Sequence, residues 1–214
     1  YRNYAGNVLQ LGAGIAASDI SLSRDSNDLL LSHSNGTDQV RVKNWYAADR
    51  NQLAQIEFVD GTVWDTQTLT DGGLFLEGSA GNDTLNGLAY YTNVINGYEG
   101  DDTIVSGRLA DSIDGGAGND TITIVHQNEG AVALGGAGDD DLSTQYHAVN
   151  STLHGGQGTD TLESGNDSTT YLFNLGDGVD TIDQRDRGSY RNYAGNVLQL
   201  GAGIAASDIS LSRD

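Results

Sequence analysis

Six short turns rich in glycine and aspartate recur from residue 78 onward at nearly constant spacing. The six segments are GSAGND (78–83), GYEGDD (97–102), GGAGND (115–120), GGAGDD (135–140), GGQGTD (155–160) and LGDGVD (175–180). Their final aspartates lie 19, 18, 20, 20 and 20 residues apart, and an aliphatic residue follows two positions after each aspartate. Two nine-residue units of turn and strand complete one coil of a solenoid in about 18 residues. The spacing therefore predicts that the six turns stack on one edge of a β-roll.

The same turns carry the residue types that calcium prefers. Calcium takes six to eight oxygen ligands and tolerates irregular geometry, and glycine lets the backbone turn with positive φ and direct its carbonyls at an ion. Each ion would lie between one turn and the next, so six turns predict about five calcium ions per repeat, the last being the weakest. The candidate ligands are the sixth-position carboxylates Asp83, Asp102, Asp120, Asp140, Asp160 and Asp180, the fifth-position side chains Asn82, Asp101, Asn119 and Asp139, with Thr159 less suited, and the fourth-position glycines Gly81, Gly100, Gly118, Gly138, Gly158 and Gly178. Val179 occupies the fifth position of the last turn and offers no side-chain ligand.

The pattern G-G-x-G-x-D-x-U-x, with U aliphatic, resembles the RTX, or haemolysin-type calcium-binding, repeat family. Residues 1–70, with LGAGIAASDISLSR, NDLLLS, DQVRVKNWY and QIEFVDGTVWD, resemble the related module that accompanies such repeats. The resemblance implies repeats that stay unfolded in low cytosolic calcium, leave by a one-step (type I) secretion channel and fold outside the cell. The predicted fold class is all-β: a parallel β-roll, or β-solenoid, with calcium turns stacked on one edge, preceded by a short-strand β module.

Stacked carboxylates make calcium a folding switch in this prediction. Neighbouring strands lie about 4.8 Å apart, and two like charges at that distance repel by about 3–4 kcal/mol at an effective dielectric of about 20. The core of the roll would be thin, filled by the aliphatic residues after the aspartates and by Leu76, Ile95, Ile113, Leu153 and Phe173. We therefore expect residues 71–183 to be largely unfolded without calcium.

The opposite edge of the roll departs from the pattern. It is occupied by LAYYTN, GRLAD, HQNEGA, QYHAVN and SGNDSTT, among which only SGRLADSID (106–114) keeps an aspartate, Asp111, at the aspartate position. We expect calcium along one edge and little or none along the other.

Residues 1–70 read as short strands instead. The predicted strands are Val8–Leu11, Asp19–Ser23, Asp28–Ser32, Gln39–Trp45, Gln55–Val59 and Thr62–Asp65, the last two joined at Asp60-Gly61 by a two-residue hairpin. Residues 47–54 are expected to form one or two helical turns.

A duplication sets the organisation of the chain. Residues 1–25 recur unchanged as residues 190–214, an offset of 189 residues. We expect a piece of a tandem array in which neighbouring copies follow one another end to end. The predicted parts are the related β module (1–70), the calcium-binding roll (71–183) and the start of the next repeat (184–214).

Composition limits the remaining functions. A net charge of −20 disfavours nucleic acid, because phosphate binding needs a basic surface. The chain lacks cysteine and has no apolar run long enough for membrane insertion. Its four histidines have no metal-ligand spacing, GxSxG is absent and no carboxylate pair stands out, so we do not expect an enzyme.

Two functions remain, ahead of a third in which tyrosines bind a sugar or other ligand. The first is a calcium-rigidified structural repeat of a long extracellular or cell-surface protein, such as an adhesin stalk or surface fibre, because length and stiffness grow with copy number. The second is the secretion and folding module of a secreted toxin or hydrolase whose catalytic domain lies outside this sequence.

Overall fold

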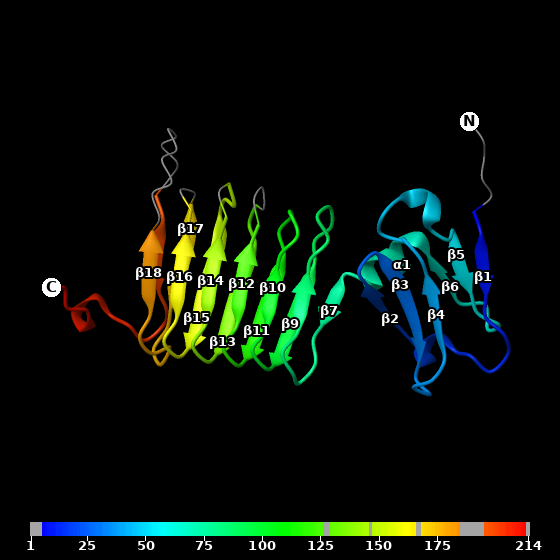
Figure 1. The fold of residues 1–214 in the computed structure, drawn as a ribbon, viewed down its shortest axis with the longest axis horizontal. Helices are drawn as coiled ribbons and strands as arrows, with labels where there is room; N and C mark the ends of the chain where they lie inside the picture. Colours follow the sequence, from blue (N-terminus) through cyan, green and yellow to red (C-terminus); the bar gives the residue numbers. More distant parts are fainter. Residues whose placement is uncertain (1–5, 126–128, 146, 166–167, 185–194, 213–214) are drawn as a thin grey trace. The chain divides into compact units, whose positions relative to one another are not determined.

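The computed structural model describes residues 6–125, 129–145, 147–165, 168–184 and 195–212. The chain divides into two compact units, Tyr1–Leu76 and Glu77–Asp214 (Figure 1). The boundary predicted between residues 70 and 71 precedes this division and falls inside a short helix, α1 (Thr66–Gly72).

The first unit contains two small sheets. A parallel pair, β1 and β5, continues antiparallel into β6, while β2, β3 and β4 form an antiparallel meander. Five of the six predicted strands are confirmed to within two residues at each end, whereas the strand predicted over Gln39–Trp45 ends at Val42 and Trp45 lies in a turn. The hairpin at Asp60-Gly61 forms, but its loop has three residues (59–61) rather than two, because the Phe58 N–H donates to the Thr62 carbonyl. Asp49–Asn51 form the expected helical turn. The elements are β1 (Val8–Gln10), η1 (Ala17–Asp19), β2 (Ile20–Asp25), β3 (Asp28–His33), β4 (Gln39–Val42), η2 (Asp49–Asn51), β5 (Gln55–Glu57), β6 (Val63–Asp65) and α1 (Thr66–Gly72).

The helix α1 was not expected from the sequence. It begins where the Asp65 side chain accepts a hydrogen bond from the Thr68 N–H at 2.8 Å, which satisfies one of the unpaired donors of the first turn. The Trp45 indole N–H donates to the Thr70 hydroxyl at 3.2 Å, and the Tyr46 hydroxyl donates to the Thr70 carbonyl at 2.9 Å. These two contacts fix the helix against a core in which Trp45 is fully buried.

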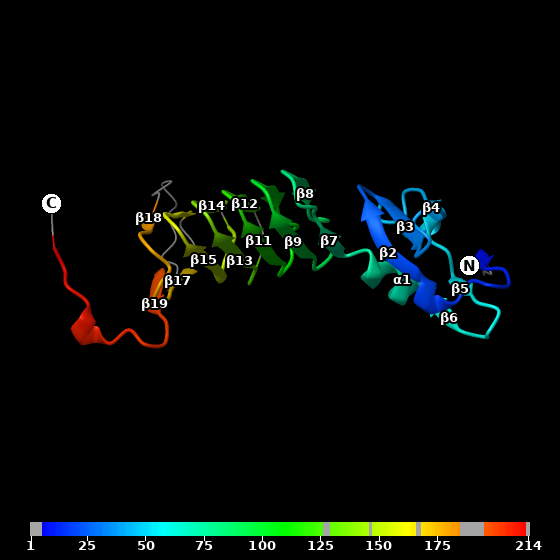
Figure 2. The same ribbon diagram turned by 90° about the horizontal axis from the view of Figure 1, so that it is seen from below.

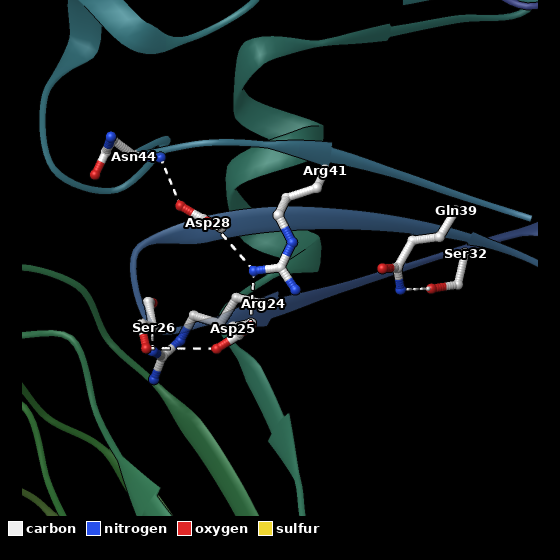
Figure 3. Close-up of polar contacts among 8 residues, drawn as sticks. All are labelled: Arg24, Asp25, Ser26, Asp28, Ser32, Gln39, Arg41 and Asn44. Atoms are coloured by element: carbon white, nitrogen blue, oxygen red, sulfur yellow. Dashed lines mark hydrogen bonds and ion pairs between the residues drawn. The ribbon is translucent and has the colours of Figure 1, made fainter.

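Charged side chains fasten the meander at its first turn (Figure 3). Arg41 on β4 lies 2.7 Å from the Asp25 carboxylate and 3.1 Å from that of Asp28, and Asp28 also accepts the Asn44 N–H at 2.7 Å. The Arg41 guanidinium and the Asn44 N–H hold the pKa of Asp28 below its usual range, the Asn44 contact being the larger cause. Because Arg41 and Asp25 are exposed and Asp28 is only partly buried, the effect of these ion pairs on stability is small.

The second unit is a roll of two parallel sheets, with neighbouring strands arranged in sequence order (Figures 1 and 2). The seven-stranded sheet consists of β7 (Phe75–Glu77), β9 (Val94–Glu99), β11 (Ser112–Ala117), β13 (Val132–Ala137), β15 (Ser151–Gln157), β17 (Thr169–Phe173) and β19 (Val197–Leu200). The six-stranded sheet consists of β8 (Thr84–Asn86), β10 (Thr103–Val105), β12 (Thr121–Ile124), β14 (Asp141–Thr144), β16 (Thr161–Ser164) and β18 (Thr181–Gln184). A single 3-10 turn, η3 (Ala206–Asp208), follows β19. The predicted all-β solenoid is confirmed.

Aliphatic ladders from both sheets fill the core of the roll. From the six-stranded sheet, Ile104, Ile122, Leu142 and Leu162 are at most 1% exposed, as their place after each turn predicted. On the other sheet the expected Ile95, Ile113 and Leu153 are joined by Ala133, and all four are buried.

The core prediction for Phe173 was wrong, because Tyr171 takes that place. Leu153 is paired with Tyr171, which is 1% exposed, whereas Phe173 is only half-buried. This pairing leaves two more residues between the core position and the last aspartate of the turn than the preceding coil has. The sixth turn accommodates them: the Asn174 N–H donates to the Asp177 carboxylate and the Asp177 N–H donates to the Asn174 carbonyl.

No helix among the described residues is long and apolar enough to cross a membrane.

Candidate metal-binding edge of the roll

The six turns connect the seven-stranded sheet to the six-stranded sheet along one edge of the roll, called here the aspartate edge (78–83, 97–102, 115–120, 135–140, 155–160 and 175–180). Backbone hydrogen bonds run from turn to turn: the Gly100 N–H donates to the Ala117 carbonyl at 2.8 Å and the Gly118 N–H to the Ala137 carbonyl at 2.9 Å. Gly118 has φ of 132°, and a Cβ atom there would collide with the Gly100 carbonyl oxygen. Only glycine permits both the conformation and the close stacking.

The sixth-position aspartates form a ladder in which each carboxylate reaches back to the preceding turn. Oδ1 of Asp102 accepts the Asp83 N–H at 2.7 Å, and Oδ1 of Asp120 accepts the Asp102 N–H at 2.8 Å. The ladder continues through Asp140 and Asp160 and weakens at Asp180, where the donor–acceptor distance is 3.4 Å. The predicted sixth-position residues are thus brought together in one column.

The second carboxylate oxygen of this column is left without a protein donor. Oδ2 is buried and has no hydrogen-bond partner in five of the six aspartates, namely Asp102, Asp120, Asp140, Asp160 and Asp180. A buried, unpaired carboxylate oxygen costs several kcal/mol unless a proton or a cation compensates it. The column therefore offers a row of buried carboxylate oxygens that a cation could compensate.

A glycine carbonyl of the following turn faces each central orphaned oxygen. A Cβ atom added to Gly97 would lie 2.2 Å from Asp102 Oδ2 and 2.3 Å from the Gly115 carbonyl oxygen, so these two oxygens are within about 4.5 Å of each other, close enough for one calcium ion to bind both. The same convergence joins Asp120 Oδ2 to the Gly135 oxygen and Asp140 Oδ2 to the Gly155 oxygen. The first interval likewise brings Asp83 Oδ2 near the Gly97 oxygen, so four consecutive intervals pair a carboxylate with a glycine carbonyl, and in the last three of them Oδ2 has no protein donor. These oxygen donors fit calcium.

The ends of the column differ from its centre. In the first turn, Asp83 Oδ2 accepts hydrogen bonds from the Ser79 N–H at 2.6 Å and the Ser79 hydroxyl at 2.9 Å. In the last turn Leu175 replaces the first glycine, and the Asp160 N–H lies 3.4 Å from Asp180 Oδ1, farther than at the other steps of the ladder. The first and last intervals are therefore less complete than the three between them.

The fifth-position side chains form a second ladder that runs the other way. Asn82 Oδ1 accepts the Asp101 N–H of the following turn at 3.0 Å, and Asp101 Oδ1 accepts the Asn119 N–H at 2.8 Å. Asn119 and Asp139 continue it to the Asp139 and Thr159 N–H groups. These side chains are exposed, and Oδ1 of each is used in the backbone ladder. This ladder of side-chain acceptors was not predicted from the sequence.

Burial perturbs the titration of the column. Burial, with a smaller contribution from Asp120 and Asp160, raises the pKa of Asp140 to about 7. Burial and then the Asp160 charge raise the pKa of Asp180 to about 6, and burial also raises the pKa values of Asp120 and Asp160. Without a cation, burial therefore shifts these four carboxyls toward their protonated form.

The opposite edge satisfies its aspartate internally. Asp111 is 1% exposed, and its Oδ1 accepts both the backbone N–H and the side-chain amide N–H of Asn93, at 2.6 and 2.9 Å. Its Oδ2 accepts the Gly107 N–H. Asn93 in turn bonds to the Leu88 and Tyr91 backbone. Asn93 was missed from the sequence, although its position 18 residues before Asp111 matches one coil.

Carboxylates alone do not make a metal cluster in the part of the chain that the structure describes. No three acidic or histidine side chains there gather closely enough to hold an ion. A bound ion would therefore take many of its ligands from backbone carbonyls, which suits calcium better than zinc.

Comparisons with known families agree with this chemistry. The haemolysin-type calcium binding protein related domain matches residues 28–68. The RTX calcium-binding nonapeptide repeat matches four times, over residues 75–89, 90–112, 96–123 and 150–171. No curated protein and no solved structure matches the chain.

Proposed function

Because the chain belongs to the RTX calcium-binding repeat family, we propose that it is a structural repeat of a long extracellular protein, an adhesin stalk or surface fibre, that folds and stiffens on binding calcium. The observation that carries this proposal is the column of buried, unpaired Oδ2 atoms on the aspartate edge. A divalent cation in each interval would compensate the charge of these carboxylates in place of protons, and it would remove the repulsion between stacked carboxylates.

The donor sets support an order of affinity among the five intervals. Calcium would bind most tightly in the three intervals that follow Asp102, Asp120 and Asp140, where a glycine carbonyl converges with the orphaned oxygen. The interval after Asp83 would be weaker because Ser79 already occupies that carboxylate, and the interval after Asp160 because Leu175 interrupts the motif. The fourth-position glycine carbonyls and the fifth-position side chains stay predictions from the sequence, and the exposed fifth-position side chains would contribute less to binding than the buried carboxylates.

Binding of this kind is coupled to folding. Calcium stabilises the folded roll by an amount that grows with its free concentration, and the ion-free roll bears the cost of its buried carboxyls. A secreted chain would thus stay unfolded where calcium is scarce and fold where it is abundant, which accounts for an extracellular location.

The unbroken duplication supports the fibre over a catalytic role. Residues 1–25 recur without change at 190–214, and units of about 189 residues that follow one another in this way would add length and stiffness. A solenoid of stacked repeats is also a structural kind of domain. The alternative is a secretion and folding module attached to a toxin or hydrolase. The neighbouring sequence separates the two: further copies after residue 214 favour the fibre, whereas a single unique catalytic domain beside one roll would refute it.

Calcium-dependent folding is tested by circular dichroism. We expect the 214-residue chain to gain β signal when millimolar calcium replaces a chelator, while magnesium at the same concentration gives little change. An unchanged spectrum in chelator would refute the coupling. Electron microscopy of several joined units should then show rods in calcium and flexible coils in chelator.

A further inference from the structure

One repeated segment occupies two different settings in the structure. Residues 7–12, NVLQLG, recur as residues 196–201. In the first copy they form β1, which pairs in parallel with β5 of the first unit. In the second copy they form β19, which pairs in parallel with β17 as the last strand of the roll (Figure 2).

The first copy uses one side of the strand. The Asn7 carbonyl accepts the Ala54 N–H at 2.8 Å, and the Leu11 N–H donates to the Glu57 carbonyl at 2.9 Å. Because successive residues of a strand direct their N–H and C=O groups to opposite sides, Asn7, Leu9 and Leu11 face β5.

The second copy uses the other side. The Gly201 N–H donates to the Phe173 carbonyl at 2.8 Å, so that Val197, Gln199 and Gly201 face β17. The counterparts of these residues in the first copy are residues 8, 10 and 12, which face away from β5. The counterparts of the β5-facing residues are residues 196, 198 and 200, whose backbone groups point away from β17.

The glycines of the segment give independent support. A Cβ atom on Gly6 would collide with Ala54, but on its counterpart Gly195 it would meet nothing within 4 Å. On Gly201 it would collide with Asn174, but on its counterpart Gly12 it would again meet nothing within 4 Å. Each copy thus has close neighbours at only one of the two glycines.

Side chains around β19 follow the same division. The Asn196 side chain accepts the Thr169 N–H at 2.9 Å and donates to the Ser164 hydroxyl at 3.0 Å, which leaves its backbone carbonyl for the other side. Leu198 is paired with buried Tyr171 yet is 55% exposed. Its counterpart Leu9 is paired with Ile56, which is fully buried, and is itself half-buried.

We propose that β19 is at the same time the last strand of the roll and the first strand of the next copy of the first unit. The copy of β5 in that next repeat would pair with the side of β19 formed by residues 196, 198 and 200. The seven-stranded sheet would then continue through β19 into the counterparts of β5 and β6. This junction rests on the tandem array of the proposed function, and its occupant is a further copy of residues 55–57.

A shared strand has two consequences for the array. One row of inward-facing side chains would cross the repeat boundary. It would run from Ile113 through Leu153, Tyr171 and Leu198 to the counterpart of Ile56, so that the two parts share one core. The exposed side of β19, which as a free sheet edge would invite aggregation, would be closed. The roll of each repeat would thus be joined to the next repeat through backbone hydrogen bonds.

The test compares the 214-residue chain with a chain in which a second copy of residues 26–76 follows Asp214, both in calcium. Amide hydrogen exchange followed by NMR reports each side of β19 separately. We expect the Gln199 and Gly201 amides to be protected in both chains, and the Leu198 and Leu200 amides to exchange at least about 100-fold more slowly in the longer chain. Unchanged exchange at Leu198 and Leu200, or loss of protection at Gln199 and Gly201, would overturn the proposal.

Two matched proline variants provide the control. Leu200→Pro removes an N–H that faces away from β17, so in the 214-residue chain it should leave the Gly201 amide protected. Gln199→Pro removes an N–H that faces β17 and should abolish that protection. In the longer chain Leu200→Pro should restore fast exchange at Leu198, and a failure to do so would contradict the junction. Because the calcium-induced change in circular dichroism is measured separately, a failed junction and a failed calcium switch can be distinguished.

Discussion

The two edges of the roll differ in how they satisfy a buried aspartate carboxylate. Both bury an aspartate in a turn between parallel strands. On the opposite edge, Asp111 receives three N–H donors from Asn93 and Gly107, so both of its carboxylate oxygens are hydrogen-bonded within the protein, although burial still raises its pKa. On the aspartate edge, Asp120 receives one donor at Oδ1 and none at Oδ2. The comparison separates two kinds of buried carboxylate, and the proposed calcium sites lie only where the second oxygen has no protein donor.

The largest expected effect comes from filling the stacked turns. Gly138→Ala places a Cβ atom against the Gly118 carbonyl oxygen at a residue with φ of 138°, and should destabilise the calcium form by about 2–5 kcal/mol. Gly130→Ala on the opposite edge, with φ of 83° but open space around it, should cost only about 1–2 kcal/mol. Urea unfolding in calcium measures both changes in the free energy of unfolding. Equal changes would contradict the claim that the turns of the aspartate edge are stacked more closely than those of the opposite edge.

Next in size is the loss of a ligand. Asp140→Asn keeps the Oδ1 that accepts the Asp120 N–H but replaces Oδ2, so calcium affinity should fall at least about tenfold and the number of bound ions should drop by one. In chelator the same variant should retain at least as much β signal as the unchanged chain, because a buried charge has been removed. Native mass spectrometry gives the ion count. An unchanged count would remove Asp140 from the site.

The matching change on the opposite edge should behave differently. Asp111→Asn sets an amide N–H against the Gly107 N–H if the amide keeps its contacts with Asn93, and should cost about 1–3 kcal/mol with calcium present. The number of ions bound at saturating calcium should stay the same. If this variant loses an ion while Asp140→Asn does not, the assignment of the two edges is reversed.

Acidity should replace calcium at the aspartate edge. The pKa values of Asp140 and Asp180 rise to about 7 and about 6 in the folded roll, from about 3.9 in an unfolded chain. A raised carboxyl pKa means that the folded state holds more protons, so the ion-free roll should be most stable below about pH 4 and lose stability as the pH rises toward 7. Calcium binding should show the opposite trend and weaken on acidification.

The pH trend is measured by thermal unfolding in chelator and by calcium titration between pH 4.5 and 7.5. Asp140→Asn is the control. It removes one titrating carboxyl, so the dependence of stability on pH should become less steep by the contribution of that group, while the net charge of the chain hardly changes. A slope unaffected by this substitution would place the titrating groups elsewhere.

The smallest effect is expected for a fifth-position side chain. Asn119→Ala removes the acceptor of the Asp139 N–H and should cost about 0.5–1.5 kcal/mol. Because this side chain is exposed and its Oδ1 is already used, we expect the ion count to stay the same. A lost ion would instead support the prediction from the sequence that fifth-position side chains are ligands.

Period and motif were enough to predict the roll, its aspartate edge and the strands of the first unit. The sequence could not give the contacts that distinguish Asp111 from Asp120, because the donors to Asp111 come from Asn93 and Gly107 across a coil. The sequence predicted Phe173 in the core, where Tyr171 lies instead. The pairing of Leu153 with Tyr171 depends on how the sixth turn accommodates two additional residues, which the motif does not specify. The sequence missed α1 because seven residues are too few for a helical period to stand out.

The central claim is that calcium lies between the turns of the aspartate edge, against the orphaned Oδ2 atoms. Anomalous scattering from a crystal of the 214-residue chain grown in calcium tests it most directly. The account predicts peaks in the intervals after Asp102, Asp120 and Asp140, each within about 2.3–2.6 Å of an Oδ2 atom, and none beside Asp111. Calcium peaks on the opposite edge, or their absence between these turns, would contradict it.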